Sequence, residues 1–415
     1  MSKNAAFRAA DLRGASRLAV DGILGLTQLV EAMHHTIVHT PGVLGMHVPG
    51  PTKGITGFTY RSIRRVTRIV GTAIDTALGS LVPAVEPDVR SPRREAVIAA
   101  LNGVLGDYLA DSANSLAIPM RFVYLGRPLE LTADALAKAI EHPTGKLLIY
   151  IHGLCMNDMQ WAQSTQTTPS DKSPAELLAN ELGCPAIYLH YNTGRHISTN
   201  GQNLSMLMEA LVDHWPVPLT DVTIIAHSMG GLVTRSACDV AQLGKLPWLS
   251  RLKRIVFLGT PHLGAPMERG GNWVDFALGI SPYTAPLAGL GKIRSVGITD
   301  LRYGNLRDVD WIGRDRFSRT TVRPHPLPLQ RHIKCYAIAA TVAKRAGGIG
   351  EQIVGDGLVP VNSALGRSTD PQSNLAIPSS RSWVAYGINH FDLLNHPKVF
   401  ERIRRWLVPT HAAGS

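Results

Sequence analysis

The sequence predicts an α/β fold with a mostly parallel sheet covered by helices on both faces. Short apolar runs rich in β-branched or aromatic residues alternate with turns or helical stretches, and almost no polar residue interrupts them. Such runs are typical of parallel strands buried on both faces. The expected strands cover residues 147–153, 186–192, 222–228, 254–260, 333–340 and 382–387, and residues 120–131 are expected to form a hairpin with a Gly-Arg-Pro turn.

Residues 1–115 are expected to form a helical N-terminal extension, and residues 116–415 the α/β domain. Apolar positions recur at helical spacing from Leu18 to Met33 and again over residues 60–81. A third helix is expected from Pro92 to Tyr108, with Ser91 as its cap. The helix at 60–81 is basic on one side, so it either lies on an anionic membrane surface or packs its apolar face on the core.

The segment from Gly264 to Arg331 is too long for an ordinary connection, and we interpret it as an inserted cap or lid. It contains large apolar residues that would suit an acyl pocket, namely Trp273, Phe276, Leu278, Ile280 and Tyr283. The alternative is a solvated surface insertion.

Composition excludes several classes of protein. Hydrophobic residues make up 45% of the 415 residues and charged residues only 18%, which excludes a disordered tail protein. The net charge is +11, and ten basic against four acidic residues between Lys292 and Lys334 supply a large share of it. No zinc-finger spacing or recognition-helix pattern accompanies this charge, so we expect no nucleic-acid partner.

The four cysteines, Cys155, Cys184, Cys238 and Cys335, are far apart and form no Cys-x-x-Cys pair. We therefore expect neither a metal cluster nor a disulfide framework. Charge interrupts the N-terminal sequence before any secretory apolar stretch, and no apolar run is long enough to span a bilayer. These features predict a cytoplasmic protein, with peripheral membrane or lipid-surface contact left open; the oligomeric state is not predicted.

The strongest chemical signal is Ala226-His227-Ser228-Met229-Gly230, which follows an expected strand and precedes an expected helix. This is the Gly-x-Ser-x-Gly nucleophile elbow with alanine in the first glycine position. The residues two before and two after the serine must be small because the strand and helix backbones approach there. Ser228 is therefore the expected nucleophile; the alternative is an ordinary helix-capping serine.

A serine nucleophile needs a base and an orienting acid. With such an elbow the chain order is serine, acid, histidine. His390 follows the last expected strand, and Asp356 lies in the turn Gly355-Asp356-Gly357 after the strand before it. We expect these two residues to complete the triad. Weaker candidates are His325, His332 and His396 for the base, and Glu351 and Asp392 for the acid.

Two backbone amides are expected to form the oxyanion hole. One belongs to Leu154, after the strand that ends in His152-Gly153, and the other to Met229, after the nucleophile. His152, His227 and His262 are candidate pocket residues beside these elements. For each, the alternative is an ordinary packed histidine or a residue that fixes a turn.

Several of these motifs together resemble α/β-hydrolase lipases and esterases. They are AHSMGGL (226–232), the His-Gly pair, FLGTPHLGAP (257–266), GDGLVPVNSAL (355–365) and INHFDLLNHPKVFERIRRWL (388–407). The elbow is similar to that of small bacterial lipases, and GTPHLG resembles a block of bacterial triacylglycerol lipases and of hydrolases that deacylate glycolipid anchors. The resemblance covers residues 120–408 and implies the α/β-hydrolase fold with Ser228, Asp356 and His390 as triad.

These observations predict a serine hydrolase that cleaves a small-molecule carboxylic ester through an acyl-enzyme. The chemistry requires no metal or organic cofactor. An acyltransferase or thioesterase using the same triad is the alternative, and a non-enzymatic binding protein with this fold is the third hypothesis.

Overall fold

The computed structural model describes residues 11–21, 24, 65, 72, 90, 92–162, 172–265, 295–314, 324–343 and 355–408. Most of the helices expected over 18–33 and 60–81, the capping residue Ser91 and the apolar residues of the insertion lie outside these residues. The chain forms two compact units, residues 1–94 with 111–117 and residues 95–110 with 118–415. The domain boundary expected at residue 115 stays a prediction.

In the first unit, residues 11–21 are helical. Arg94 donates hydrogen bonds to the carboxylate of Asp11, one of them 2.6 Å from Nη2 to Oδ1. Asn114 Nδ2 donates to the carbonyl of Gly14 over 3.1 Å. These contacts join segments of the unit that are far apart in sequence.

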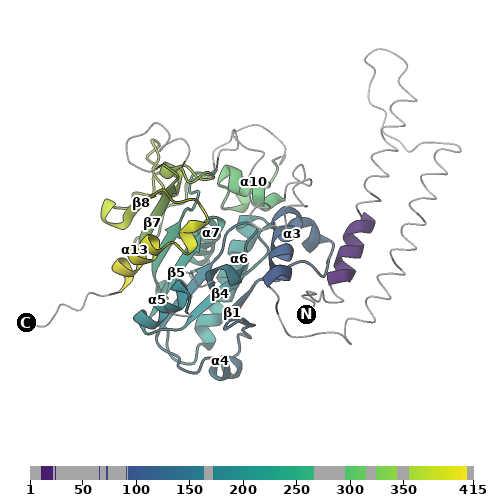
Figure 1. Cartoon of the computed structure of the whole chain (residues 1–415), viewed down its shortest axis with the longest axis horizontal. Helices are drawn as coiled ribbons and strands as arrows, with labels where there is room; N and C mark the ends of the chain where they lie inside the picture. The colour runs from purple at the N-terminus through teal and green to yellow at the C-terminus, as the bar shows by residue number, and fades with distance from the viewer. Residues whose placement is uncertain are drawn as a thin grey trace, which may run out of the picture. The chain divides into compact units, whose positions relative to one another are not determined.

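The second unit contains a mixed sheet of eight strands in the order β2-β1-β4-β3-β5-β6-β7-β8 (Figure 1). Strands β3 to β8 pair in parallel, and β1 pairs antiparallel with β2 and β4. The bounds are β1 Arg121–Tyr124, β2 Arg127–Pro128, β3 Lys146–Ile151, β4 Ala186–His190, β5 Asp221–His227, β6 Leu252–Leu258, β7 Lys334–Thr341 and β8 Ser382–Tyr386. The fold class predicted from the apolar runs is confirmed.

The predicted hairpin is confirmed, but its turn is one residue earlier than expected. Leu125 and Gly126 both have positive φ, 48° and 76°, and Tyr124 pairs with Arg127. Two positive φ values are what a tight two-residue hairpin turn requires. Arg127 and Pro128 therefore belong to β2 instead of the turn.

The helices from α3 onward alternate with the strands of the sheet. They are α3 Pro92–Asp111, α4 Ala133–Ala139, α5 Pro174–Leu182, α6 Ile197–His214, α7 Met229–Gly244, α8 Trp248–Arg251, α10 Val296–Tyr303, α12 Val361–Ala364 and α13 Pro397–Leu407. Helix α5 shows why such a segment starts and stops where it does. Ser173 and Glu176 form a capping box at its start, and Gly183 ends it in the left-handed conformation.

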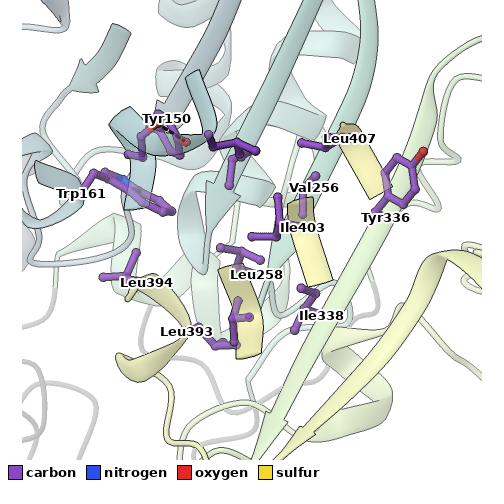
Figure 2. Close-up of a cluster of buried hydrophobic side chains, with 14 of the residues drawn as sticks. Tyr150, Trp161, Val256, Leu258, Tyr336, Ile338, Leu393, Leu394, Ile403 and Leu407 are labelled. Carbon is purple, nitrogen blue, oxygen red and sulfur yellow. Dashed lines mark hydrogen bonds between the residues drawn. The ribbon is translucent and has the colours of Figure 1, made fainter. Parts of the chain in front are cut away.

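Helices cover both faces of the sheet. On one face, Tyr150, Val256 and Ile338 pack with side chains of α5 and α13 (Figure 2). On the other face, Phe257 lies against Gly231 of α7. Because successive strand residues point to opposite faces, a sheet covered on both sides needs the uninterrupted apolar runs seen in the sequence. No helix in the described residues has the length and hydropathy to span a membrane.

The parallel strands β3, β5, β6, β7 and β8 all end at one edge of this sheet. The loops that follow them begin at His152, Ser228, Gly259, Val342 and Gly387. Ligands of open α/β sheets bind outside the carboxyl ends of the strands, so the candidate site residues emerge at the edge where a site is expected.

Candidate active site

Ser228 forms a strained turn between β5 and α7. Its φ and ψ are 52° and −123°, a conformation that residues other than glycine rarely adopt. The Ser228 amide donates to the carbonyl of Leu258 over 2.8 Å, which fastens the turn to the end of β6. Strain at a non-glycine residue persists only where its surroundings enforce it, and such residues gather at functional sites.

The small residues around Ser228 are required by the packing. A Cβ on Gly230 would lie 2.6 Å from the carbonyl oxygen of His152 and 2.8 Å from that of Ile151. A Cβ on Gly153 would lie 2.9 Å from Cβ of Ser228. The start of α7, the end of β3 and the serine turn are thus in direct contact. A mostly parallel sheet covered by helices, with a strained serine between a strand and a helix, fits the α/β-hydrolase fold.

His390 and Asp356 form a buried hydrogen-bonded pair. His390 Nδ1 lies 2.6 Å from Asp356 Oδ2, and both side chains are about 1% exposed or less. The other oxygen of Asp356, Oδ1, accepts from the amides of Leu358 and Val359 at 3.0 and 2.8 Å. These backbone bonds fix the carboxylate. The carboxylate in turn orients the imidazole and sets which nitrogen carries a proton.

Two neighbours hold His390 in place. His227 Nε2 lies 3.0 Å from the His390 carbonyl oxygen and donates to it, and the two rings lie 4.6 Å apart. Burial, followed by the proximity of His390, holds the pKa of His227 well below its ordinary value, so His227 is neutral. A Cβ on Gly259, whose φ is 57°, would lie 3.0 Å from Cε1 and Nδ1 of the His390 ring. Because a side chain at residue 259 would crowd the imidazole of His390, this position favours glycine.

The structure thus brings Asp356 and His390 together and sets them beside the serine turn. Leu258 accepts the amide of Ser228, and the next residue, Gly259, abuts the imidazole of His390. The Ser228 hydroxyl is buried and has no hydrogen-bond partner in the described part of the chain. A serine–histidine bond is therefore not formed in this structure. Such catalytic bonds are often long before substrate binds.

The loop after β3 brings Gly153, the residue before Leu154, against Ser228. Cys155 adopts a φ of 58°, and its amide donates to Thr193 Oγ1 over 3.2 Å. Gly103 of α3 packs against the Cys155 side chain so closely that a Cβ there would lie 2.1 Å from Sγ. Met229 is the first residue of α7, where amides have no partner within the helix. Both expected oxyanion donors therefore lie on backbone that is fixed from several sides.

The three candidate pocket histidines have different surroundings. His152 is fully buried, stacked on Tyr191 at 4.5 Å, and its carbonyl accepts the Tyr191 hydroxyl. His227 packs against His390, as described above. His262 lines a cavity beside α7. Of the three, only His262 lies on this cavity.

The weaker base and acid candidates have other partners. His325 Nδ1 lies 2.9 Å from Asp310, His332 Nε2 lies 3.1 Å from the carbonyl of Leu249, and the His396 side chain caps α13. Asp392 accepts from the amide of Asn389. Glu351 lies outside the described residues.

The cysteines do not compete as nucleophiles. All four are free, and burial raises the pKa of Cys155 to about 12 and that of Cys335 to about 12. Thiols with such values stay protonated near pH 7, and the thiolate is the reactive form. Among the described residues, no group of three His, Cys, Asp or Glu side chains is arranged to hold a metal ion.

Sequence reasoning missed three features of this region. Gly153 and Gly259 allow the close approaches around Ser228 and His390, and Arg235 lies buried on α7. Each glycine lies at the end of a predicted strand, 147–153 or 254–260, in a motif already noted, so the signal was present. Nothing in the sequence distinguishes Arg235 from a surface arginine of an amphipathic helix.

Comparison with known proteins adds little beyond the fold. A family model described as "Domain of unknown function (DUF7379)" matches residues 127–291. No curated protein sequence matches the chain.

Three solved structures illustrate the similarities at the level of structure. A lipase of Bacillus licheniformis in its mature form is 17% identical, with 65% of this chain and 96% of that one covered and a TM-score of 0.40. An esterase of Pyrococcus furiosus is 14% identical, with 64% of this chain and 84% of that one covered and a TM-score of 0.35. An esterase of Pyrobaculum calidifontis is 11% identical, with 78% of this chain and 92% of that one covered and a TM-score of 0.35. The sheet order and the serine turn, instead of these similarities, support the fold assignment.

Proposed function

We propose that the protein is a serine hydrolase that cleaves carboxylic esters, with Ser228 as nucleophile, His390 as base and Asp356 as orienting acid. The observation that carries the proposal is the buried His390–Asp356 pair, 2.6 Å apart, beside a strained serine whose hydroxyl has no partner in the described residues. A buried hydroxyl without a partner is costly, and its retention at a strained turn favours a catalytic role.

In the proposed first step, His390 accepts the proton of Ser228 Oγ while Oγ attacks the ester carbonyl carbon. Asp356 stabilises the imidazolium without taking its proton. The carbonyl oxygen becomes an oxyanion that accepts from the amides of Leu154 and Met229. His390 then protonates the leaving alcohol, and the acyl group stays on Ser228.

In the second step, water takes the place of the alcohol. His390 removes a proton from the water, whose oxygen attacks the acyl carbon, and the same two amides hold the second oxyanion. Proton return to Ser228 Oγ releases the carboxylic acid. Backbone donors positioned beforehand need no reorganisation, and each such donor is worth about 3 kcal/mol of barrier in comparable sites.

Acyl transfer to an alcohol or thiol other than water would use the same residues. The described structure holds no feature that favours a particular acceptor, so hydrolysis is the proposal. Adding methanol or a small thiol to an ester reaction measures how the acyl-enzyme partitions. Release mainly of the free acid supports a hydrolase, and dominant transfer to the added acceptor shows an acyltransferase.

The direct test is a p-nitrophenyl ester series from acetate to palmitate with the full chain. We expect release of p-nitrophenol, and we expect Ser228→Ala to abolish it. The variant Ser236→Ala is a control, because Ser236 is a buried serine of the same helix whose hydroxyl donates to the Leu306 carbonyl. Turnover of no ester by a folded wild-type chain, or equal turnover by Ser228→Ala, would contradict the proposal.

A further inference from the structure

A second candidate site lies beside α7 and includes none of the proposed catalytic residues. It is a cavity of about 280 Å³ formed by α7, the loop after β6, the residues before β7 and the segment after α12. The lining residues that matter here are Arg235, His262, His325, Ser368, Gln372 and Ser373.

Arg235 is a buried cation that has no carboxylate partner in the part of the chain that the structure describes. Its side chain is on α7, about two turns beyond Ser228, and the residue is 5% exposed. It donates to the carbonyl of Leu327 and lies 3.4 Å from Nδ1 of His262. Its Nε has no hydrogen-bond partner, and no acid of the described residues lies within ion-pair distance. Buried arginines are almost always paired with an acid, so this one is incomplete as it stands.

The nearest acid on the same helix is already engaged. Asp239 accepts two hydrogen bonds from Arg307, 2.7 Å from Nε and 2.6 Å from Nη2. The guanidinium of Arg307 therefore binds a carboxylate through two nitrogens, whereas the guanidinium of Arg235 contacts two neutral groups, the His262 imidazole and the Leu327 carbonyl. Arg235 and Asp239 are both on α7, but Asp239 binds Arg307 and leaves Arg235 without an acid among the described residues.

Among the described residues that line the cavity, Arg235 is the one arginine or lysine. Burial lowers the pKa of Arg235 to about 10, which leaves the guanidinium charged at pH 7. Burial and then Arg235 hold the pKa of His262 well below its ordinary value, so that imidazole is neutral. His325 Nδ1 lies 2.9 Å from Asp310 Oδ1.

From this geometry we infer that the cavity binds a small organic carboxylate, whose oxygens take the place of the missing acid at Arg235. A planar carboxylate matches the fork of a guanidinium bidentately. One buried positive charge balances one negative charge, which favours a carboxylate over a phosphate dianion. The hydroxyl and amide side chains of Ser368, Gln372 and Ser373 give the same wall further polar groups. Asp370, whose carboxylate accepts from Gln372 N and Ser373 Oγ, is not among the lining residues.

Isothermal titration calorimetry of the full chain with benzoate, benzamide and phenyl phosphate tests the inference. We expect benzoate to bind with a Kd below 1 mM and at least tenfold more tightly than either benzamide or phenyl phosphate. The same titration of Ser228→Ala should give the same Kd for benzoate. This makes the result independent of the proposed hydrolysis, whose failure would leave benzoate binding intact.

Variants locate the binding. Gln372→Glu keeps the shape of an exposed lining side chain and adds a negative charge, so it should weaken benzoate binding at least threefold. Asn374→Asp is the matched control, because it adds the same charge nearby on a residue that does not line the cavity and keeps the oxygen that accepts from Ala376 N. Arg235→Lys should weaken binding at least tenfold, because lysine keeps the charge but lacks the fork.

Three results would overturn the inference. They are the absence of benzoate binding, binding of benzamide or phenyl phosphate as tight as that of benzoate, and benzoate binding that Gln372→Glu and Asn374→Asp change equally. Gln372→Glu lies on the surface and is expected to fold, so the inference can be tested even if Arg235→Lys does not fold.

Discussion

Two buried histidine–carboxylate pairs lie in the same unit of this molecule, and one of them adjoins the proposed nucleophile. His390 Nδ1 lies 2.6 Å from Asp356, and His190 Nδ1 lies 2.8 Å from Asp158. All four side chains are at most 4% exposed. By distance and burial the two pairs are nearly equivalent.

Their surroundings differ. The second nitrogen of His190 lies 3.9 Å from Glu95 of α3, so this imidazole lies between two carboxylates. His390 instead adjoins Gly259, His227 and the turn of Ser228. A histidine between two acids links α3 to the sheet, whereas a histidine beside a serine hydroxyl can move a proton. We therefore expect that what lies beyond the imidazole, and not the pair itself, decides whether a buried pair is catalytic.

Removing members of the Ser228 site should have the largest effect. We expect Ser228→Ala and His390→Ala each to lower kcat by about 10⁶-fold, and the double variant to lower it little further, because the residues act as a unit. Asp356→Asn should cost about 10⁴-fold. Steady-state kinetics on a p-nitrophenyl ester measures all four, and additive losses in the double variant would show that Ser228 and His390 act separately.

The equivalent change in the other pair should affect stability instead. Weakening a buried hydrogen bond to a carboxylate costs about 1–3 kcal/mol, so Asp158→Asn should lower the free energy of unfolding by an amount of that order. The kcat of the folded variant should stay within about threefold of wild type. Urea denaturation and ester kinetics on the same preparation check this. A loss of kcat as large as that of Asp356→Asn would remove the distinction between the pairs.

A smaller effect is expected from Gly153→Ala. The new methyl would lie 2.9 Å from Ser228 Cβ and 3.0 Å from His227 Nδ1, so the serine turn or the oxyanion loop must shift. A displacement of about 1 Å costs roughly 10²-fold in rate. Gly244→Ala is the matched control, because its methyl meets its nearest neighbour at 3.4 Å. Unchanged kcat in Gly153→Ala would mean that the contact does not position the reacting groups.

The smallest effect concerns pH. Burial, as the largest cause, holds the pKa values of His227 and His262 below 6.5, so the unfolded chain binds protons that the folded chain does not. The free energy of unfolding should therefore fall as pH drops from 6.5 towards 5, by up to about 1.4 kcal/mol per pH unit for each histidine. When the free energy of unfolding is measured by urea denaturation at several pH values in this window, it should change less with pH for His262→Gln than for wild type. An equal slope in that variant would show that His262 titrates normally.

The sequence predicted what depends on local pattern. Strands β3 to β8 were found from their apolar runs, and Ser228 was predicted from the small residues that the elbow requires. His390 and Asp356 were predicted from their order along the chain, and the structure places them in contact. The role of Gly259 depends on its approach to His390, 131 residues later in the sequence. The His190 pair was missed because Glu95, Asp158 and His190 belong to no local motif and meet only after folding.

The most direct test of the central claim is the reaction of the protein with a fluorophosphonate, followed by peptide mass spectrometry. The account predicts a single adduct on Ser228 in wild type, equally fast labelling in folded Asp158→Asn and labelling slowed by orders of magnitude in Asp356→Asn. An adduct on another residue, or equal labelling rates in Asp158→Asn and Asp356→Asn, would contradict it.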